Sequence, residues 1–281
     1  MADPVPVYFC PEMVADAASY SPSAAKPAAV VARFLDRGLP VVVARPDPVT
    51  EGDLARAHAP SYVREVLAGR RDNGFGNRRA DVARSLPFTS GAMLSAARAA
   101  LACQRVTCAP CSGFHHAAWD HGAGFCTFNG LVVTAAALHA ERPGVRVGIL
   151  DCDMHYGDGT DEILDRLGLR GFVQHVTIGA RFGAREDAAP FLSALPELVR
   201  AFRGCDVLLY QAGADPHVDD PLGGFLTTDE LARRDAIVFG EARALGLPVA
   251  WNLAGGYQRD ARGGIEPVLQ IHENTLRACA G

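Results

Sequence analysis

The sequence predicts an α/β fold in which a parallel β-sheet is covered by helices on both faces. Short apolar runs alternate along the chain with amphipathic segments, which is the pattern of repeated strand–helix units. The 281 residues are 49% hydrophobic and 21% charged, so the chain can bury a sizeable core. Because there is no repeat, low-complexity tract or Pro/Ser-rich linker, we expect a single domain over residues 1–281.

The first half of the chain predicts two strands and four helices. The strands are short apolar runs rich in Val, and the helices are rich in Ala or carry apolar residues at helical spacing. In chain order they are strand 5–10, helix 26–37, strand 39–44, helices 51–57 and 61–67 on either side of Pro60, and helix 90–103. Residues 70–84 are rich in Gly and Arg and predict a surface loop.

The second half repeats the alternation more regularly. In chain order it predicts a helix from about 129 to 140, strand 145–150, a helix near 160–167, strand 172–178, helix 191–202, strand 207–211, helix 229–245, strand 248–253 and a helix from about 264. Strands joined in this way by helical crossovers run parallel, and both faces of their sheet are covered.

Composition and charge exclude several kinds of partner. The net charge is −5 and Lys26 is the single lysine, so the chain offers no basic surface for nucleic acid. No apolar run approaches the length of a membrane span, and the first residues lack the pattern of a signal peptide. We therefore expect a cytoplasmic protein with no membrane partner, and a homo-oligomer is compatible with the sequence.

The eight cysteines are irregularly spaced and predict reduced thiols. Cys108 and Cys111 form a Cys-x-x-Cys pair in a predicted loop leading to His115. A redox or zinc role would need a helix N-terminus behind the first thiol or a second such pair. The sequence shows neither, so we expect two semi-buried thiols, with a redox role as the alternative.

Polar clusters follow three of the predicted strands and occupy one loop. They are residues 151–158, 213–217 and 254–257, each directly after a strand, and the adjacent pair His115 and His116. In parallel sheets, ligands bind beyond the carboxyl ends of the strands. The clusters therefore predict one site at this edge of the sheet.

The cluster after strand 145–150 indicates a metal ion. Ionised carboxylates at the end of a buried strand are unfavourable unless a cation or dense hydrogen bonding compensates them. Asp153 and His155 alternate and so point the same way, and Asp215 would be a third ligand. Three such ligands leave a position open, as in catalytic zinc sites, although iron(II), cobalt or manganese would also fit. The alternative is that Asp151 or Asp153 caps a helix and His155 is a loop histidine.

Asp151 and Asp158 remain once the metal ligands are assigned, and they can pair with His115 and His116. A carboxylate bonded to one ring nitrogen fixes the tautomer of a histidine and raises its basicity. Tyr257 follows two glycines, and its phenol could donate to a developing oxyanion. The alternatives are two incidental adjacent histidines and an ordinary half-buried tyrosine.

Ordered motifs run from about residue 58 to residue 257. They are His58-x-x-x-Tyr62-Val63, Gly113-Phe114-His115-His116-Ala117, Gly124-Phe125-Cys126-x-Phe128-Asn129, Asp151-x-Asp153-x-His155-x-Gly157-Asp158-Gly159-Thr160, Gly213-Ala214-Asp215 with Asp220-Pro221-Leu222-Gly223-Gly224-Phe225, and Gly255-Gly256-Tyr257. In this order they resemble the signatures of the histone deacetylase and acetylpolyamine amidohydrolase family. The ordered set is far more specific than any one motif.

The resemblance implies an arginase-like fold, a single α/β domain with a mainly parallel eight-stranded sheet. It implies Zn²⁺, with Fe²⁺ or Co²⁺ as alternatives, bound by Asp153, His155 and Asp215. It further implies a structural K⁺ beside Asp151 and near Thr177.

The resemblance also implies the catalytic roles. His116 would be general base for the zinc-bound water and then proton donor to the leaving amine, with His115 as its electrostatic partner. Asp158 would orient His116, and Asp151 would orient His115. The remaining roles are polarisation of the amide carbonyl by Tyr257 and a narrow substrate channel lined by Gly124 and Phe125.

The implied activity is hydrolysis of an N-acyl, chiefly N-acetyl, amide of a lysine side chain or a small amine. Tyr156 stands where many members have a second histidine, and the segment 179–185 is shorter than the one that usually supplies a second aromatic wall, for which Phe182 is the candidate here. A manganese ureohydrolase of the same fold and a non-catalytic binder of acylated amines are the alternatives. A thiol oxidoreductase using Cys108 and Cys111 is a more distant one.

Overall fold

The parallel sheet expected from the sequence forms the centre of the molecule. The computed structural model describes residues 3–281, and every statement about its helices and strands refers to that range. Seven strands are hydrogen-bonded in the order β2-β1-β3-β7-β6-β4-β5, and all neighbours are parallel. The strands are β1 (Val5–Tyr8), β2 (Val41–Ala44), β3 (Thr107–Ala109), β4 (Val147–Asp151), β5 (Val173–Thr177), β6 (Val207–Gln211) and β7 (Val249–Asn252).

Helices lie between and after the strands along the chain. They are α1 (Lys26–Asp36), α2 (Glu51–Leu54), α3 (Pro60–Leu67), α4 (Ala80–Cys103), α5 (Gly130–Glu141), α6 (Asp158–Arg166), α7 (Ala188–Arg200), α8 (Thr228–Ala244) and α9 (Glu266–Ala280). Four 3₁₀ turns complete the described elements: Pro11–Met13, Leu169–Gly171, Ile178–Ala180 and Arg185–Asp187.

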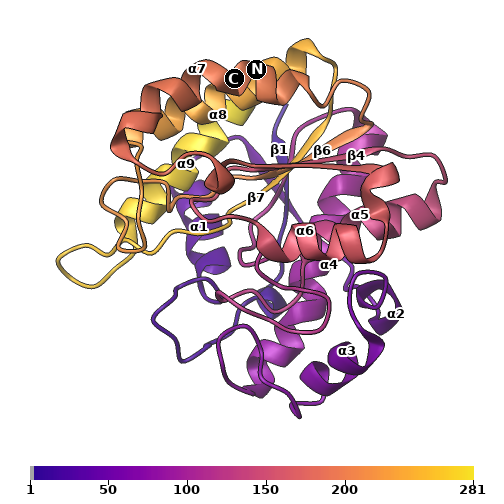
Figure 1. Cartoon of the computed structure of the whole chain (residues 1–281). Coiled ribbons are helices and arrows are strands. Elements are labelled where there is room, and N and C mark those ends of the chain that lie inside the picture. Colours follow the sequence, from indigo (N-terminus) through magenta and orange to yellow (C-terminus); the bar gives the residue numbers. More distant parts are fainter. Residues whose placement is uncertain (1–2) are drawn as a thin grey trace.

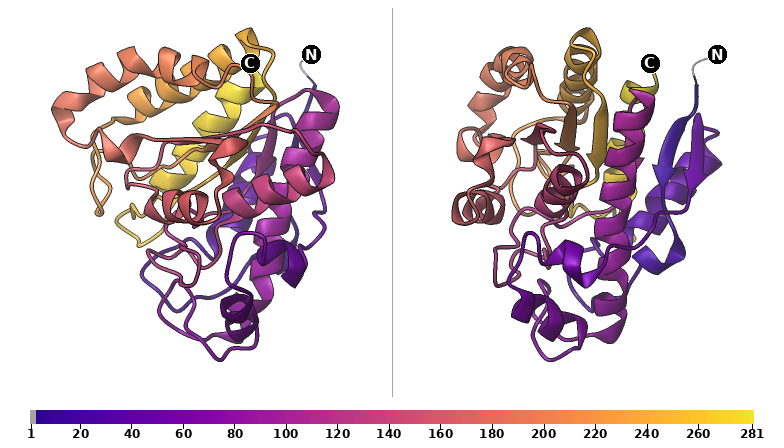
Figure 2. Two further views of the ribbon diagram at one scale, coloured as in Figure 1. Left: turned by 45° about the vertical axis from the view of Figure 1, so that its right-hand side comes forward. Right: turned by 90° about the vertical axis from the view of Figure 1, so that its right-hand side faces the viewer.

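The helices form two layers with the sheet between them (Figures 1 and 2). Helices α1, α7, α8 and α9 share one hydrophobic cluster, and α2 to α6 share the other. Alternate residues of β6 enter opposite clusters, with Leu208 and Tyr210 in the first and Val207 and Leu209 in the second. Both faces of the sheet are therefore buried, as the apolar strands predicted.

The structure corrects the expected count of eight strands, because the described residues contain seven. After β5 the chain forms the turns Ile178–Ala180 and Arg185–Asp187 and then enters α7. The Asp187 carboxylate accepts hydrogen bonds from the N–H groups of Gly183 and Ala184, and these bonds fix the connection in a turn. The short connection leaves β5 at the edge of the sheet.

Two further elements differ from the prediction. Cys108 lies in β3 rather than in a loop, and both Cys108 and Cys111 are fully buried rather than semi-buried. Helix α4 begins at Ala80 and continues through Pro87, whereas a helix only from residue 90 was expected. The Pro87 carbonyl accepts a hydrogen bond from Val49 N, so α4 is tied here to the segment before α2.

Candidate metal centre and active site

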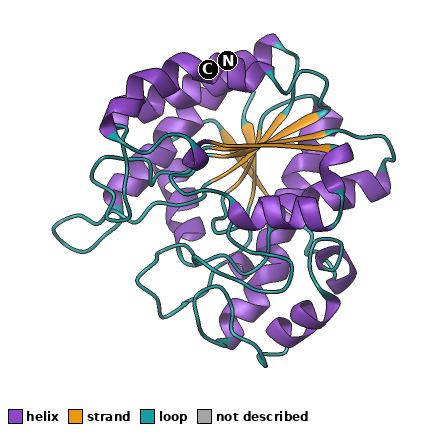
Figure 3. Cartoon of the chain, viewed as in Figure 1, coloured by secondary structure: helices purple, strands orange, loops and turns teal. Residues whose placement is uncertain are grey.

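Three neighbouring strands end at the same level and carry the polar clusters there. In the sheet register, Asp151 of β4 lies opposite Gln211 of β6, which lies opposite Asn252 of β7. The segments that follow these ends contain the predicted metal ligands and Tyr257. Loops gather on one side of the sheet, at the lower left of Figure 3.

Asp153, His155 and Asp215 converge on one point, as the sequence predicts. Their ligand atoms lie within 4.8 Å of one another, and within the described residues they are the one such group that could hold a metal ion. His155 Nδ1 lies 3.1 Å from both Asp153 Oδ1 and Asp215 Oδ2. Asp153 and Asp215 are both buried. This is an arrangement of two carboxylates and one imidazole that demands a positive charge.

The acid–base properties of the three side chains fit a divalent ion. Hydrogen bonds to Asp153 and then Asp215 raise the pKa of His155 to about 11. Burial raises the pKa of Asp215 well above its usual range, and the charge of Asp153 adds to this. Asp215 Oδ1 is buried without a hydrogen-bond partner. A bound cation would replace the proton on His155 and give that oxygen a partner, so these residues fit a metal.

The two predicted histidine–aspartate pairs are formed. His115 Nδ1 lies 2.8 Å from Asp151 Oδ2, and His116 Nδ1 lies 2.6 Å from Asp158 Oδ1. The two rings are 4.1 Å apart between centroids, and the His116 ring lies 5.8 Å from that of His155. Each histidine therefore has one ring nitrogen held by a carboxylate beside the metal-ligand cluster.

The two histidines differ in charge. Burial opposes a charge on His115, but the attraction of Asp151 and then Asp153 outweighs it and raises the pKa of His115 to about 9. Burial and the neighbouring charge of His115 together lower the pKa of His116, although its bond to Asp158 opposes them. Near neutral pH this leaves His115 charged and His116 able to accept a proton.

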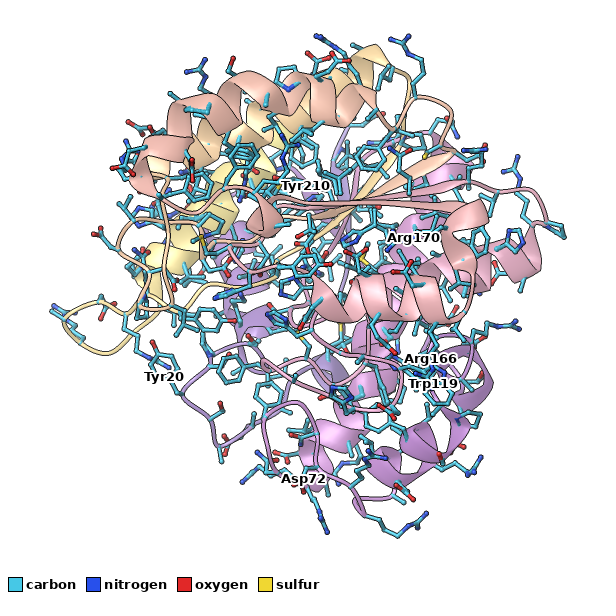
Figure 4. The ribbon with its side chains drawn as sticks, viewed as in Figure 1. Tyr20, Asp72, Trp119, Arg166, Arg170 and Tyr210 are labelled. Atoms are coloured by element: carbon cyan, nitrogen blue, oxygen red, sulfur yellow. The ribbon has the colours of Figure 1, made fainter. Side chains whose placement is uncertain are left out.

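Tyr257 lies within a row of aromatic rings. Its ring centroid is 5.6 Å from that of Phe125, which lies 6.0 Å from that of Phe75. The Tyr20 ring stacks on Tyr257 at 6.4 Å between centroids. Tyr20 is half exposed and lies on an outer loop, labelled in Figure 4. Burial, with the charges of Asp215 and Asp153, raises the pKa of Tyr257, which keeps the phenol protonated.

Gly124 and Phe125 have left-handed backbone conformations. Both have positive φ, +52° and +65°, so the loop turns sharply there. A Cβ on Gly124 would lie 2.5 Å from His116 Cδ2, which shows how closely this backbone approaches the histidine. The backbone of Gly124 thus lies beside His116, and the Phe125 ring lies beside Tyr257.

Two other residues singled out in the sequence make contacts of a different kind. The Phe182 ring is partly buried and packs on Phe191 of α7 at 5.3 Å between centroids. The Tyr156 phenol donates to Asp161 Oδ2 across 2.6 Å, towards α6. Tyr20 and Phe75, rather than Phe182, extend the aromatic row.

The site also contains buried cations that sequence reasoning missed. Arg234 of α8 donates to the main-chain carbonyls of Gly213 at 2.6 Å and Cys152 at 3.2 Å. Lys26 of α1 donates to those of Ala254 at 2.7 Å and Gly255 at 3.3 Å. Each carbonyl belongs to a segment that carries a candidate metal ligand or Tyr257. The available sequence signal was the presence of a single lysine.

Within the part of the chain that the structure describes, no helix has the length and apolarity to cross a membrane.

Cys108 and Cys111 lie behind the site, and burial raises the pKa of both thiols. Buried, protonated thiols are poor nucleophiles, which argues against the thiol-redox alternative.

Comparison with known proteins agrees with these features. A family model described as histone deacetylase domain matches residues 22–167. An uncharacterized protein of Picosynechococcus is 30% identical over 231 residues, which cover 74% of this chain and 76% of that protein. Acetylpolyamine amidohydrolase 2 of Pseudomonas aeruginosa is 30% identical over 171 residues, which cover 51% of this chain and 48% of that enzyme, about half its length.

The fold has a solved counterpart. The crystal structure of acetylpolyamine aminohydrolase from Burkholderia pseudomallei superposes with a TM-score of 0.73 and covers 98% of both chains at 22% identity. The match in architecture extends over nearly the whole chain. The match of the domain model to residues 22–167, about half of the chain, shows that this chain belongs to the histone deacetylase and acetylpolyamine amidohydrolase family.

Proposed function

We propose that this chain is a metal-dependent deacetylase that hydrolyses an N-acetyl amide of a lysine side chain or a small amine. The convergence of three side chains suited to a metal, two histidine–aspartate pairs and one buried phenol on the same point carries the proposal. The proposal treats residues 1–281 as one catalytic domain, because both hydrophobic clusters flank a single sheet.

Asp153, His155 and Asp215 would hold the metal, for which we propose Zn²⁺. When bound, such an ion polarises the amide carbonyl and lowers the pKa of water. A structural K⁺ beside Asp151 remains a prediction. Asp151 lies directly opposite Thr177 in the sheet register, and its Oδ1 accepts a hydrogen bond from Gln211 Nε2.

The histidine pairs would move the protons. Because Asp158 holds Nδ1 of His116, the other ring nitrogen is left to take a proton from the attacking water. The same nitrogen then returns the proton to the leaving amine. His115, charged and held by Asp151, stabilises the negative charge that accumulates during the reaction.

Tyr257 would act on the carbonyl oxygen. Its protonated phenol donates a hydrogen bond that strengthens as negative charge develops on that oxygen. Phe125 and Tyr20 both neighbour Tyr257, with Phe75 beyond Phe125, and such aromatic surroundings suit an aliphatic stem such as that of acetyl-lysine. The acetylpolyamine amidohydrolase relative supports an acetylated amine as the substrate class.

The test is a hydrolysis screen in which the product is identified. Wild-type protein with measured metal content is incubated with acetyl-lysine peptides, acetylpolyamines and small N-acetyl amines, and the acetate released is quantified. The Asp215→Asn variant should lose the activity. Asp219→Asn is the matched control, because that carboxylate is exposed. Release of urea from an arginine-like substrate, or tight binding of acetylated amines without turnover, would contradict the proposal.

A further inference from the structure

Lys26 is the single lysine of a chain that has 27 Lys and Arg residues in total, and it is fully buried. It stands at the first position of α1, directly before Pro27. Its Nζ donates to the carbonyl oxygens of Ala254 at 2.7 Å and Gly255 at 3.3 Å. Removing an ammonium group from water is strongly unfavourable, so a lysine placed against two main-chain carbonyls requires an explanation.

The carbonyls that accept these bonds belong to the segment that carries Tyr257. Ala254 has φ +51°, a left-handed backbone conformation that residues other than glycine rarely adopt. Such strain persists only where the surroundings hold it, and it is concentrated at functional sites. Lys26 donates its hydrogen bond to the carbonyl of this strained residue itself.

Gly255 connects the same turn to the metal ligands. Its N–H donates to Asp153 Oδ2 at 2.8 Å, and its carbonyl accepts from Ala214 N at 2.9 Å as well as from Lys26. Two residues further on, Tyr257 N–H donates to Asp220 Oδ2 at 2.8 Å. A shift of this turn would therefore move the Tyr257 phenol relative to Asp153.

We propose that Lys26 is a positioning residue that holds Ala254 in its left-handed turn and thereby aims the Tyr257 phenol at the substrate carbonyl. The inference rests on the proposed function for the role of Tyr257, but not for the geometry of the turn. The charged and titratable groups around Lys26 are Asp215, Asp153 and Asp220, with Cys111 and His272 also near. The ammonium thus adds positive charge behind a cluster of carboxylates.

The first test follows the turn itself and needs no activity. Hydrogen exchange of the Gly255 and Tyr257 amides reports their bonds to Asp153 and Asp220. In Lys26→Met these two amides should exchange at least about tenfold faster, while the amides of β6 keep their protection. Lys26→Arg, which keeps the charge and the donors, should keep most of the protection that the two amides have in the wild type. Unchanged exchange at both amides in Lys26→Met would overturn the proposal.

The second test asks whether Lys26 acts by holding the strained backbone of Ala254. Glycine adopts positive φ freely, so Ala254→Gly should slow the amide exchange of Lys26→Met back towards the wild-type rate. Gln104→Gly is the matched control, because Gln104 also has a left-handed backbone, φ +52°, but ends α4. It should leave the effect of Lys26→Met unchanged. Equal effects of Ala254→Gly and Gln104→Gly would contradict the coupling.

The kinetic test separates this inference from the proposed function. Lys26→Met should lower kcat about tenfold or more with little change in KM and with metal content unchanged. Tyr257→Phe should then cost far less in the Lys26→Met background than in the wild type, because the phenol is already misplaced. If no acetylated amine is hydrolysed by the wild type, the proposed function fails while the exchange result stands. If hydrolysis is found and the two kinetic losses multiply, the positioning role fails.

Discussion

The main-chain N–H of Gly255 donates to Asp153 Oδ2 across 2.8 Å and so ties the loop after β7 to a proposed metal ligand after β4. The same glycine faces the other carboxylate ligand, because a Cβ at this position would lie 2.3 Å from Asp215 Oδ2. Gly255 therefore supports both carboxylates of the candidate metal centre, and its lack of a side chain is what allows it to do so.

Gly255→Ala is expected to weaken metal binding by roughly 10–100-fold, because the added methyl group displaces Asp215. The dissociation constant for Zn²⁺, measured by competition with a chromogenic chelator, checks this. Gly240→Ala is the control, since a Cβ there meets nothing within 4 Å and the residue lies inside α8. Equal affinities in the two variants would contradict the account.

Tyr257→Phe should lower kcat by about 100–1,000-fold, because it removes one hydrogen-bond donor from the developing oxyanion. The metal content and the unfolding temperature should stay close to those of the wild type. Tyr156→Phe removes a phenol hydroxyl whose bond goes to Asp161, so this variant should keep its kcat. Full turnover by Tyr257→Phe would exclude the role of the phenol.

Asp158→Asn should lower kcat by at least about a hundredfold while the metal stays bound. An asparagine amide can donate to His116 Nδ1, and the ring then carries its proton on Nε2 and no longer accepts one from water. Asp120→Asn provides a control, because Asp120 makes the same kind of bond, 2.9 Å, to the exposed His121. Steady-state kinetics of both variants should separate the two aspartates clearly.

Because His58 is buried, we expect the protein to lose stability towards unfolding in weak acid. Its Nδ1 donates to the Ala118 carbonyl at 2.9 Å, and its Nε2 accepts from Asn129 N at 2.8 Å. Burial lowers the pKa of His58 from 6.5 to about 4. A lowered folded-state pKa contributes stability that is present above pH 6.5 and is lost as the pH falls to about 4, up to about 3 kcal/mol.

Urea unfolding at several pH values checks this expectation. His58→Gln should be less stable than the wild type at pH 7.5, because the substitution removes the two well-placed hydrogen bonds of the imidazole ring. Between pH 6.5 and 4 its free energy of unfolding should fall less steeply than that of the wild type. Parallel pH dependences of the two proteins would show that His58 does not titrate in this way.

The sequence predicted most of the sheet because its strands are uniformly apolar and lie between amphipathic segments. Strand β6 has the predicted bounds, whereas β3 was missed because three residues, Thr107–Ala109, show no periodicity of their own. Helix α4 was predicted too short because Pro87 usually ends a helix, and here the helix continues through it.

Most residues of the candidate site were found through their placement after strands, since chemistry and position agree there, whereas Gly124 and Phe125 were indicated by the family resemblance alone. Lys26 and Arg234 were missed because a sequence does not show that a cation is buried or that its partners are main-chain carbonyls. The hydrogen bond from Tyr156 to Asp161 is likewise not visible in the sequence. Such contacts depend on tertiary packing, which no local pattern encodes.

Titration of metal into the metal-free protein, with acetate release followed from an acetylated amine, tests the central claim most directly. The account predicts no hydrolysis without metal and activity that saturates at one ion per chain, with Asp153, His155 and Asp215 as its ligands. Hydrolysis by the metal-free protein, or saturation only at two ions per chain, would contradict it.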